Sequence, residues 1–103
     1  MSEELRAKLK GEVLSVDAAS LLPHHRRQAL WILEPAVDLL DVALAIAEDR
    51  SGEIEALIGS KQLQRPELGQ LADWCVDTEL RFQCVILQPY VLAQVITRDL
   101  GKN

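Results

Sequence analysis

The stretch "LRFQCVILQPYVLAQVI", Leu80 to Ile96, carries the strongest strand signal in the chain. From residue 80 to residue 87, side chains alternate between two sets, which are Leu80, Phe82, Cys84 and Ile86 against Arg81, Gln83, Val85 and Leu87. Such alternation is typical of a β-strand with one face more buried than the other. Pro89 cannot donate to a sheet ladder, so the residues after it must lie at a sheet edge, begin a new strand or turn into a helix.

Two apolar segments upstream extend the sheet prediction. Residues 29–33 are short, apolar and bounded by Pro35, which is typical of a buried strand. Residues 37–49 fit a helix with Asp38 as its cap, and they also alternate like a strand. We favour the strand, paired with 29–33 as a hairpin, because residues 52–59 already supply a helix.

Helical spacing and capping residues predict four helices around these strands. The first covers residues 3–13 with Ser2 as its N-cap, and the second is a short helix that Asp17 caps and that ends near Pro23. The third covers residues 52–59, between a cap at Ser51 and a terminating Gly59. The fourth begins at Pro66 and continues through residues 68–75. The expected architecture is a single α+β domain over residues 1–103. In it, a small antiparallel sheet of two or three strands is covered by four or so helices.

The size and charge of the chain narrow the classes of function. A chain of 103 residues with 49% hydrophobic residues has enough apolar surface for one core. The net charge of −5 argues against broad binding to nucleic acid or to anionic membranes, because both would be repelled. The start "MSEELRAKLK" is charged where a secretory signal is apolar, and no window has the length of a membrane span, so we expect a cytoplasmic protein. Cys75 and Cys84 fit no metal or redox motif and are expected to be free thiols.

Three blocks of the sequence, in this order, resemble a small bacterial family known as domain of unknown function 2288. The blocks are "ELRAKL" at 4–9, "VDLLDVALAIAED" at 37–49 and "RFQCVILQPYVLAQ" at 81–94, and the likeness runs from about residue 4 to about residue 96. The resemblance implies a cytosolic bacterial protein. It implies no activity, so it assigns no catalytic or binding residue.

The basic stretch "LLPHHRRQALWIL", Leu21 to Leu33, contains both histidines of the chain. Adjacent residues point in different directions on a helix or a strand, so His24 and His25 are a poor chelating pair. Arg26 and Arg27 have the fork geometry that matches phosphate, but the few aromatic residues all lie in apolar runs. We therefore expect a solvated surface turn, with no metal and no cofactor.

Acidic residues bracket the apolar segment 37–49. Asp38, Asp41, Glu48 and Asp49 offer carboxylates of the kind that hold a hard cation such as Mg²⁺. They support an alternative function, a small metal-dependent hydrolase or another enzyme. No serine lies in a nucleophile elbow and there is no glycine-rich phosphate loop, so the main hypothesis is a non-catalytic protein-interaction or regulatory module without catalytic residues.

The stretch "LQPYVLAQ", Leu87 to Gln94, is the candidate interface. Polar groups stand at both ends of an uncharged apolar strip, an arrangement that suits a subunit or peptide contact. A sheet of two or three strands exposes edges that a partner must cover. We therefore expect a homodimer, or a protein or peptide partner, whose interface includes Gln88, Tyr90, Val91, Leu92 and Gln94.

Overall fold

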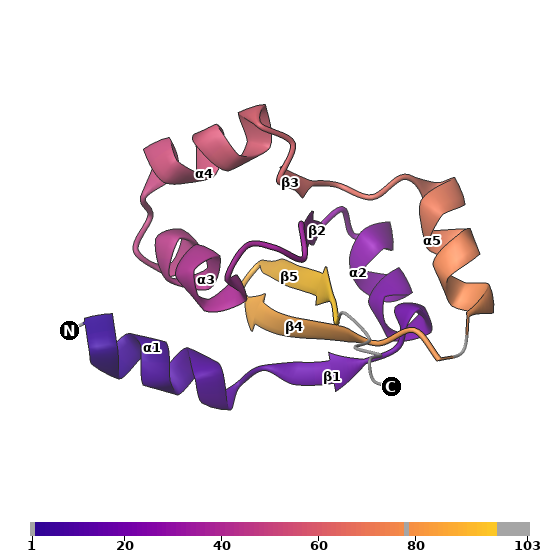
Figure 1. Ribbon diagram of the computed structural model, residues 1–103, viewed down its shortest axis with the longest axis horizontal. Helices are drawn as coiled ribbons and strands as arrows, with labels where there is room; N and C mark the ends of the chain where they lie inside the picture. Colours follow the sequence, from indigo (N-terminus) through magenta and orange to yellow (C-terminus); the bar gives the residue numbers. More distant parts are fainter. Residues whose placement is uncertain (1, 78, 97–103) are drawn as a thin grey trace.

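Five strands form one mixed sheet in the computed structural model, which describes residues 2–77 and 79–96 (Figure 1). Along the chain the elements are α1 (Ser2–Gly11), β1 (Leu14–Val16), a 3₁₀ turn η1 (Ala18–Leu21), α2 (Leu22–Arg26), β2 (Leu30–Leu33), α3 (Leu39–Ala47), α4 (Ser51–Gly59), β3 (Leu63–Gln64), α5 (Leu68–Val76), β4 (Phe82–Leu87) and β5 (Tyr90–Val95). The α+β class is confirmed. The expected sheet of two or three antiparallel strands is wrong, because the sheet has the strand order β1-β4-β5-β2-β3 and one parallel pair.

The hairpin of β4 and β5 occupies the interior of the sheet. β5 pairs antiparallel with β4 and parallel with β2, so both of its edges are hydrogen bonded. Of the three courses open to the chain after Pro89, it takes a new strand. The short strands β1 and β3 form the two edges, and the sequence analysis identified neither of them.

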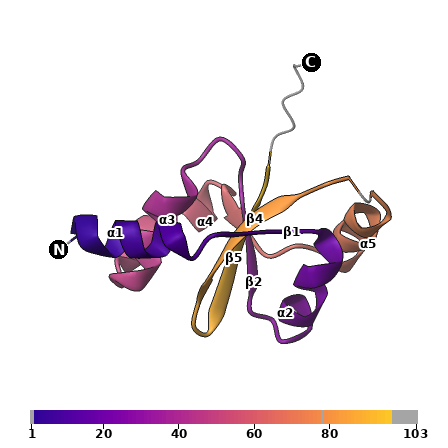
Figure 2. The same ribbon diagram turned by 90° about the horizontal axis from the view of Figure 1, so that it is seen from below.

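Helices cover both faces of the sheet (Figure 2). One side carries α1, α3 and α4, and the other carries α2 and α5. Because strand side chains alternate between faces, β5 contributes side chains to the apolar cores on both sides of the sheet. Leu92 packs with α3 residues on one side, and Val91 and Ala93 pack on the other. The chain thus builds two apolar cores, one on each side of the same central strand.

Residues 39–47 form the helix α3, so the favoured hairpin of 29–33 with 37–49 is wrong. The alternative that Asp38 caps a helix is confirmed, since its carboxylate accepts hydrogen bonds from the N–H groups of Leu40 (2.8 Å) and Asp41 (3.3 Å). Five of the nine residues of α3 are buried, which are Leu39, Val42, Ala43, Leu44 and Ala45. So broad an apolar surface satisfies strand and helix periodicity at once, which explains the error.

The predicted helices are present, but some of their ends and capping residues differ from the prediction. Asp17 does cap η1 through Ser20, whose side-chain hydrogen bond holds the pKa of Asp17 below its ordinary value. Pro23, expected near the end of this helix, instead lies in the first turn of α2. α4 ends at Gly59 as predicted, but Ser51, expected as the cap, is its first residue and Arg50 is its N-cap. The left-handed residue that follows the helix is Lys61. No helix in the part of the chain that the structure describes is long and apolar enough to cross a bilayer.

Gln94 is the one buried polar side chain in the interior that the structure describes. Its amide nitrogen donates to the carbonyl oxygens of Glu34 (2.9 Å) and Val37, and its amide oxygen accepts from Gln83 (2.6 Å). These bonds attach the connection between β2 and α3 to the central strand. A glutamine suits the position because it both donates twice and accepts.

We predict that Gln94→Leu lowers the free energy of unfolding by about 2–4 kcal/mol, since it removes the three hydrogen bonds that the buried Gln94 amide makes to Glu34, Val37 and Gln83. Urea denaturation measures the change. The control is Gln64→Leu, because Gln64 is exposed and the loss there should stay within about 0.5 kcal/mol. Equal losses in the two variants would contradict the importance of the Gln94 hydrogen bonds.

Candidate functional site

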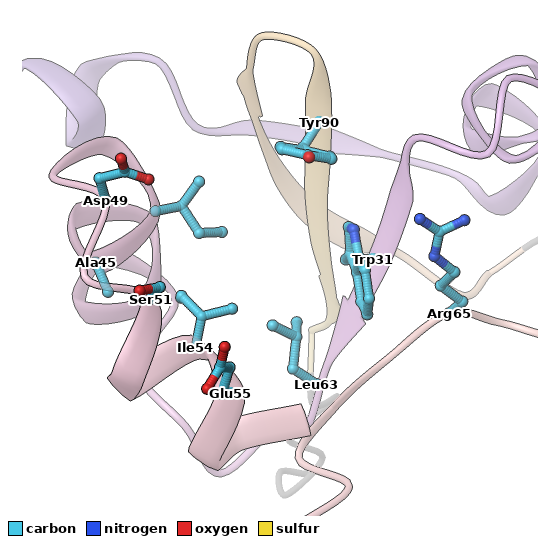
Figure 3. A pocket seen from close by; sticks show the side chains of 10 residues that line it. Trp31, Ala45, Asp49, Ser51, Ile54, Glu55, Leu63, Arg65 and Tyr90 are labelled. Atoms are coloured by element: carbon cyan, nitrogen blue, oxygen red, sulfur yellow. The ribbon is translucent and has the colours of Figure 1, made fainter. Parts of the chain in front are cut away.

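A pocket of about 330 Å³ opens between the α3–α4 connection and the strands β2, β3 and β5. It is lined by Trp31, Ala45, Ile46, Asp49, Ser51, Ile54, Glu55, Leu63, Arg65 and Tyr90. Figure 3 shows the helical residues on one side, Trp31 opposite them, and Tyr90 at one end. Its volume lies at the lower end of the range for ligand pockets, where apolar walls and a few polar groups are the usual lining.

The sheet supplies the aromatic side of this pocket. Trp31 pairs with Leu92 across the parallel strands β2 and β5, and Tyr90 precedes Leu92 by two residues. Residues two apart on a strand share a face, so both aromatic rings project from the same face of the sheet. Tyr90 remains 41% exposed, and Trp31 is half-buried. The two rings therefore present an aromatic surface that no other side chain fully covers.

Arg65 covers the outer face of the Trp31 ring. Its guanidinium carbon lies 4.8 Å from the centre of the Trp31 ring, a distance typical of a cation–π contact. In Figure 3 Arg65 stands on the side of Trp31 away from Ile54. One face of the indole is thus occupied within the chain, and the other face looks into the pocket.

Acidic side chains stand on the helical side of the pocket. Asp49 follows α3 and has a left-handed backbone with φ of 60°, and Glu55 lies on α4. Neither carboxylate forms a hydrogen bond or an ion pair with any residue in 2–77 or 79–96. The neighbouring Arg50 is already engaged by Glu48 at 2.8 Å and Glu53 at 3.1 Å. The helical side of the pocket is therefore acidic, and neither carboxylate has an ion-pair partner among the described residues.

The match to a family model runs over residues 4–95, and the model is described as a protein of unknown function, DUF2288. The chain belongs to this family. The resemblance of its three sequence blocks is thereby confirmed.

One solved structure shares the fold of this DUF2288 chain. The solution structure of PA1075 from Pseudomonas aeruginosa, determined by NMR, is 29% identical in sequence, with a TM-score of 0.77 over 92% of this chain and 87% of that one. No curated protein matches the sequence. The comparisons therefore establish the family and the fold and assign no activity.

The structure does not bring the four candidate acidic residues of this DUF2288 chain together. Asp38 and Asp41 lie at the start of α3, where Arg6 binds them at 3.2 and 2.6 Å. Hydrogen bonding to Asp41 raises the pKa of Arg6. Glu48 and Asp49 follow the other end of the helix, about 13 Å away for nine residues. Residues 2–77 and 79–96 contain no group of three His, Cys, Asp or Glu side chains placed to hold a metal.

The basic stretch also forms a structural contact. His24 and His25 occupy the last turn of α2, and the Arg27 guanidinium lies 2.6 Å from Nδ1 of His24. Because arginine only donates, this nitrogen must accept, which requires a neutral ring with its proton on Nε2. Burial, followed by the charge of Arg27, lowers the pKa of His24.

The candidate interface residues divide into two groups. Gln88 and Tyr90 are exposed at the hairpin, whereas Val91, Leu92 and Gln94 are buried by the chain itself at 1%, 0% and 3% exposure. The expectation that this stretch lies at a sheet edge is wrong, since β5 is hydrogen bonded on both sides. Tyr90 and the acidic candidate Asp49 are the residues that the sequence analysis and the pocket have in common.

Apart from Tyr90 and Asp49, the sequence analysis placed none of the lining residues of the pocket in a candidate site. Trp31 was interpreted as part of a buried strand, and Arg65 and Glu55 were not singled out. The lining comes from five elements and two connections, which only strand pairing and helix packing bring together. The exposed tyrosine after Pro89 was the available signal, because an aromatic ring with a polar tip is enriched at contacts.

We predict that His24→Ala with His25→Ala changes the free energy of unfolding at pH 7 by no more than about 0.5 kcal/mol, as for other surface substitutions. Elemental analysis should find no zinc in either protein. The single variant His24→Ala adds a test of pH dependence. The folded pKa of His24 lies below the ordinary 6.5, so protonation favours the unfolded chain and stability falls as the pH drops through 6.5. His24→Ala should therefore gain stability relative to the wild type between pH 7.5 and pH 5.5, and an unchanged difference would contradict this.

Proposed function

We propose that this DUF2288 protein is a non-catalytic protein-interaction module, and that the pocket between Trp31, Tyr90 and the α3–α4 connection receives a side chain of its partner. The observation that carries the proposal is the pair of aromatic rings on one face of the sheet, each with surface left open. Tryptophan and tyrosine dominate the energetics of protein contacts when a partner group fills the space beside them.

The composition of the pocket supports a contact with a protein. Its interior is apolar, with Ile46, Ile54 and Leu63 beside the rings, and its rim carries charged and hydroxyl groups. An apolar centre with a polar rim is the usual organisation of a protein interface. The pocket is also open on one side, which suits a protruding side chain better than an enclosed small molecule.

The alternative of a metal-dependent hydrolase has weaker support. Its four carboxylates stand at opposite ends of α3, and three of them are held by Arg6 or Arg50. A hydrolytic metal site needs carboxylates that converge on one ion within about 2–3 Å. The interaction module is therefore the function that the geometry favours, and a bacterial, cytoplasmic location, which suits the two free cysteines, is part of the same proposal.

We predict that a photocrosslinking amino acid at position 90 captures a partner from the native host, whereas the same group at position 58 does not. Tyr90 and Ile58 are each 41% exposed, so they are equally accessible and differ in their distance from the pocket. Mass spectrometry identifies the captured protein. The purified partner should bind the wild type at least about tenfold more tightly than Trp31→Ala. Equal capture at both positions, or equal affinity for Trp31→Ala, would contradict the proposed function.

The homodimer is a second proposal, with a different surface. β1 is an edge strand. Two apolar side chains there are open to solvent: Leu14 on β1 is 51% exposed and Ile86 on the neighbouring strand β4 is 44% exposed. Leu14 pairs with Cys84, and Ile86 follows Cys84 by two residues, so both project from one face. A second copy that pairs along β1 would satisfy the edge and cover this apolar pair.

Light scattering after size exclusion should give the mass of a dimer for the wild type at tens of micromolar. Ile86→Lys should give a monomer, because two like charges would be brought into one apolar contact. The matched control is Ile58→Lys, at 41% exposure on the outer helix α4, which should remain dimeric. A monomeric wild type, or a folded dimeric Ile86→Lys, would refute this interface.

A further inference from the structure

We propose that the group received by the pocket is a basic side chain with an apolar stem, a lysine of the partner protein. This inference rests on the proposed function, since it names the chemistry of the inserted group. Its basis is the combination of aromatic and aliphatic walls with two unpaired carboxylates on the same rim.

The walls match the stem of such a side chain. The inner face of Trp31 lies opposite Ile54, and the space between them is lined by carbon atoms on both sides (Figure 3). Lysine buries its methylene chain along apolar surfaces while its ammonium group stays at the polar boundary. Tyr90 at one end of the pocket adds a second ring whose face attracts a cation.

The charges around the rim select the head group. The carboxylates of Asp49 and Glu55 have no hydrogen-bond or ion-pair partner among the described residues. Arg65 covers the outer face of Trp31, and Arg50 bridges Glu48 and Glu53. An ammonium group in the pocket would therefore meet an acidic helical side, with Asp49 and Glu55 toward its two ends. An inserted carboxylate would face the same acidic side, and the cation of Arg65 lies beyond the indole ring of Trp31.

The charge of the whole protein acts in the same direction. The net charge of −5 attracts a basic segment and repels an acidic one at long range. Neither the aromatic wall nor the acidic rim is sufficient alone. A neutral aliphatic side chain would contact only the aromatic wall, and a hydrated cation would interact only with the acidic rim.

The experiment uses short peptides that differ at one central residue, which is lysine, norleucine or glutamate. Norleucine keeps the aliphatic stem of lysine and lacks the charge. Nuclear magnetic resonance follows the indole N–H signal of Trp31 during titration. The indole N–H signal of Trp74 is the internal control. Trp74 packs in the opposite core, where its ring centre lies 5.1 Å from that of Phe82, so its signal should not respond.

We expect the lysine peptide to shift Trp31 and to bind at least about tenfold more tightly than the norleucine peptide, with no binding of the glutamate peptide. The double variant Asp49→Asn with Glu55→Gln should bring lysine to the level of norleucine. The control variant Glu67→Gln with Asp73→Asn changes the net charge equally at exposed positions near and on α5, and it should retain the preference for lysine.

The possible results distinguish failure of the lysine inference from failure of the proposed function. Equal binding of lysine and norleucine peptides overturns the inference and leaves the proposed function intact, as does tighter binding of the glutamate peptide. If no peptide shifts Trp31 up to about 10 mM, both the inference and the proposed use of this pocket fail. Loss of the lysine preference in the control variant would show that net charge alone determines it.

Discussion

The buried amide of Gln94 is the constraint on which the arrangement of this fold depends. It forms three hydrogen bonds in an interior that is otherwise apolar, and its partners lie 57 and 60 residues away in the chain and on the neighbouring strand. These bonds attach the β2–α3 connection to the central strand. They thereby fix where α3 begins, and the whole helix is placed over one face of the sheet.

The candidate site follows from this placement. One wall of the pocket is made by Trp31 and Tyr90, which the parallel pairing of β2 with β5 sets side by side. The opposite wall is made by the end of α3 and the start of α4. α4 itself has no fully buried residue, so its position depends on its partly buried apolar residues and on the turn at Arg50. The shape of the pocket is therefore set by long-range contacts rather than by any local motif.

The left-handed residues that follow α2, α3 and α4 are not glycines. Gln28, Asp49 and Lys61 adopt left-handed backbones just after α2, α3 and α4, with φ between 60° and 65°. Glycine avoids the steric cost of this conformation, and no described glycine has a positive φ. The sequence analysis placed the end of α4 correctly at Gly59, but it did not identify these three left-handed residues.

The sequence alone determined those elements whose signal is local. The Asp17 cap is set by a side chain that reaches an N–H group three residues ahead, and the strand over 82–87 is set by plain alternation. The nature of residues 39–47 was decided by tertiary structure, since a helix buried over a broad face satisfies both periodicities. The interior position of β5, the edge strands and the pocket were likewise decided there. Their contacts join residues such as Leu30 and Val91 that are far apart in the chain, and local patterns carry no information about which distant strands will pair.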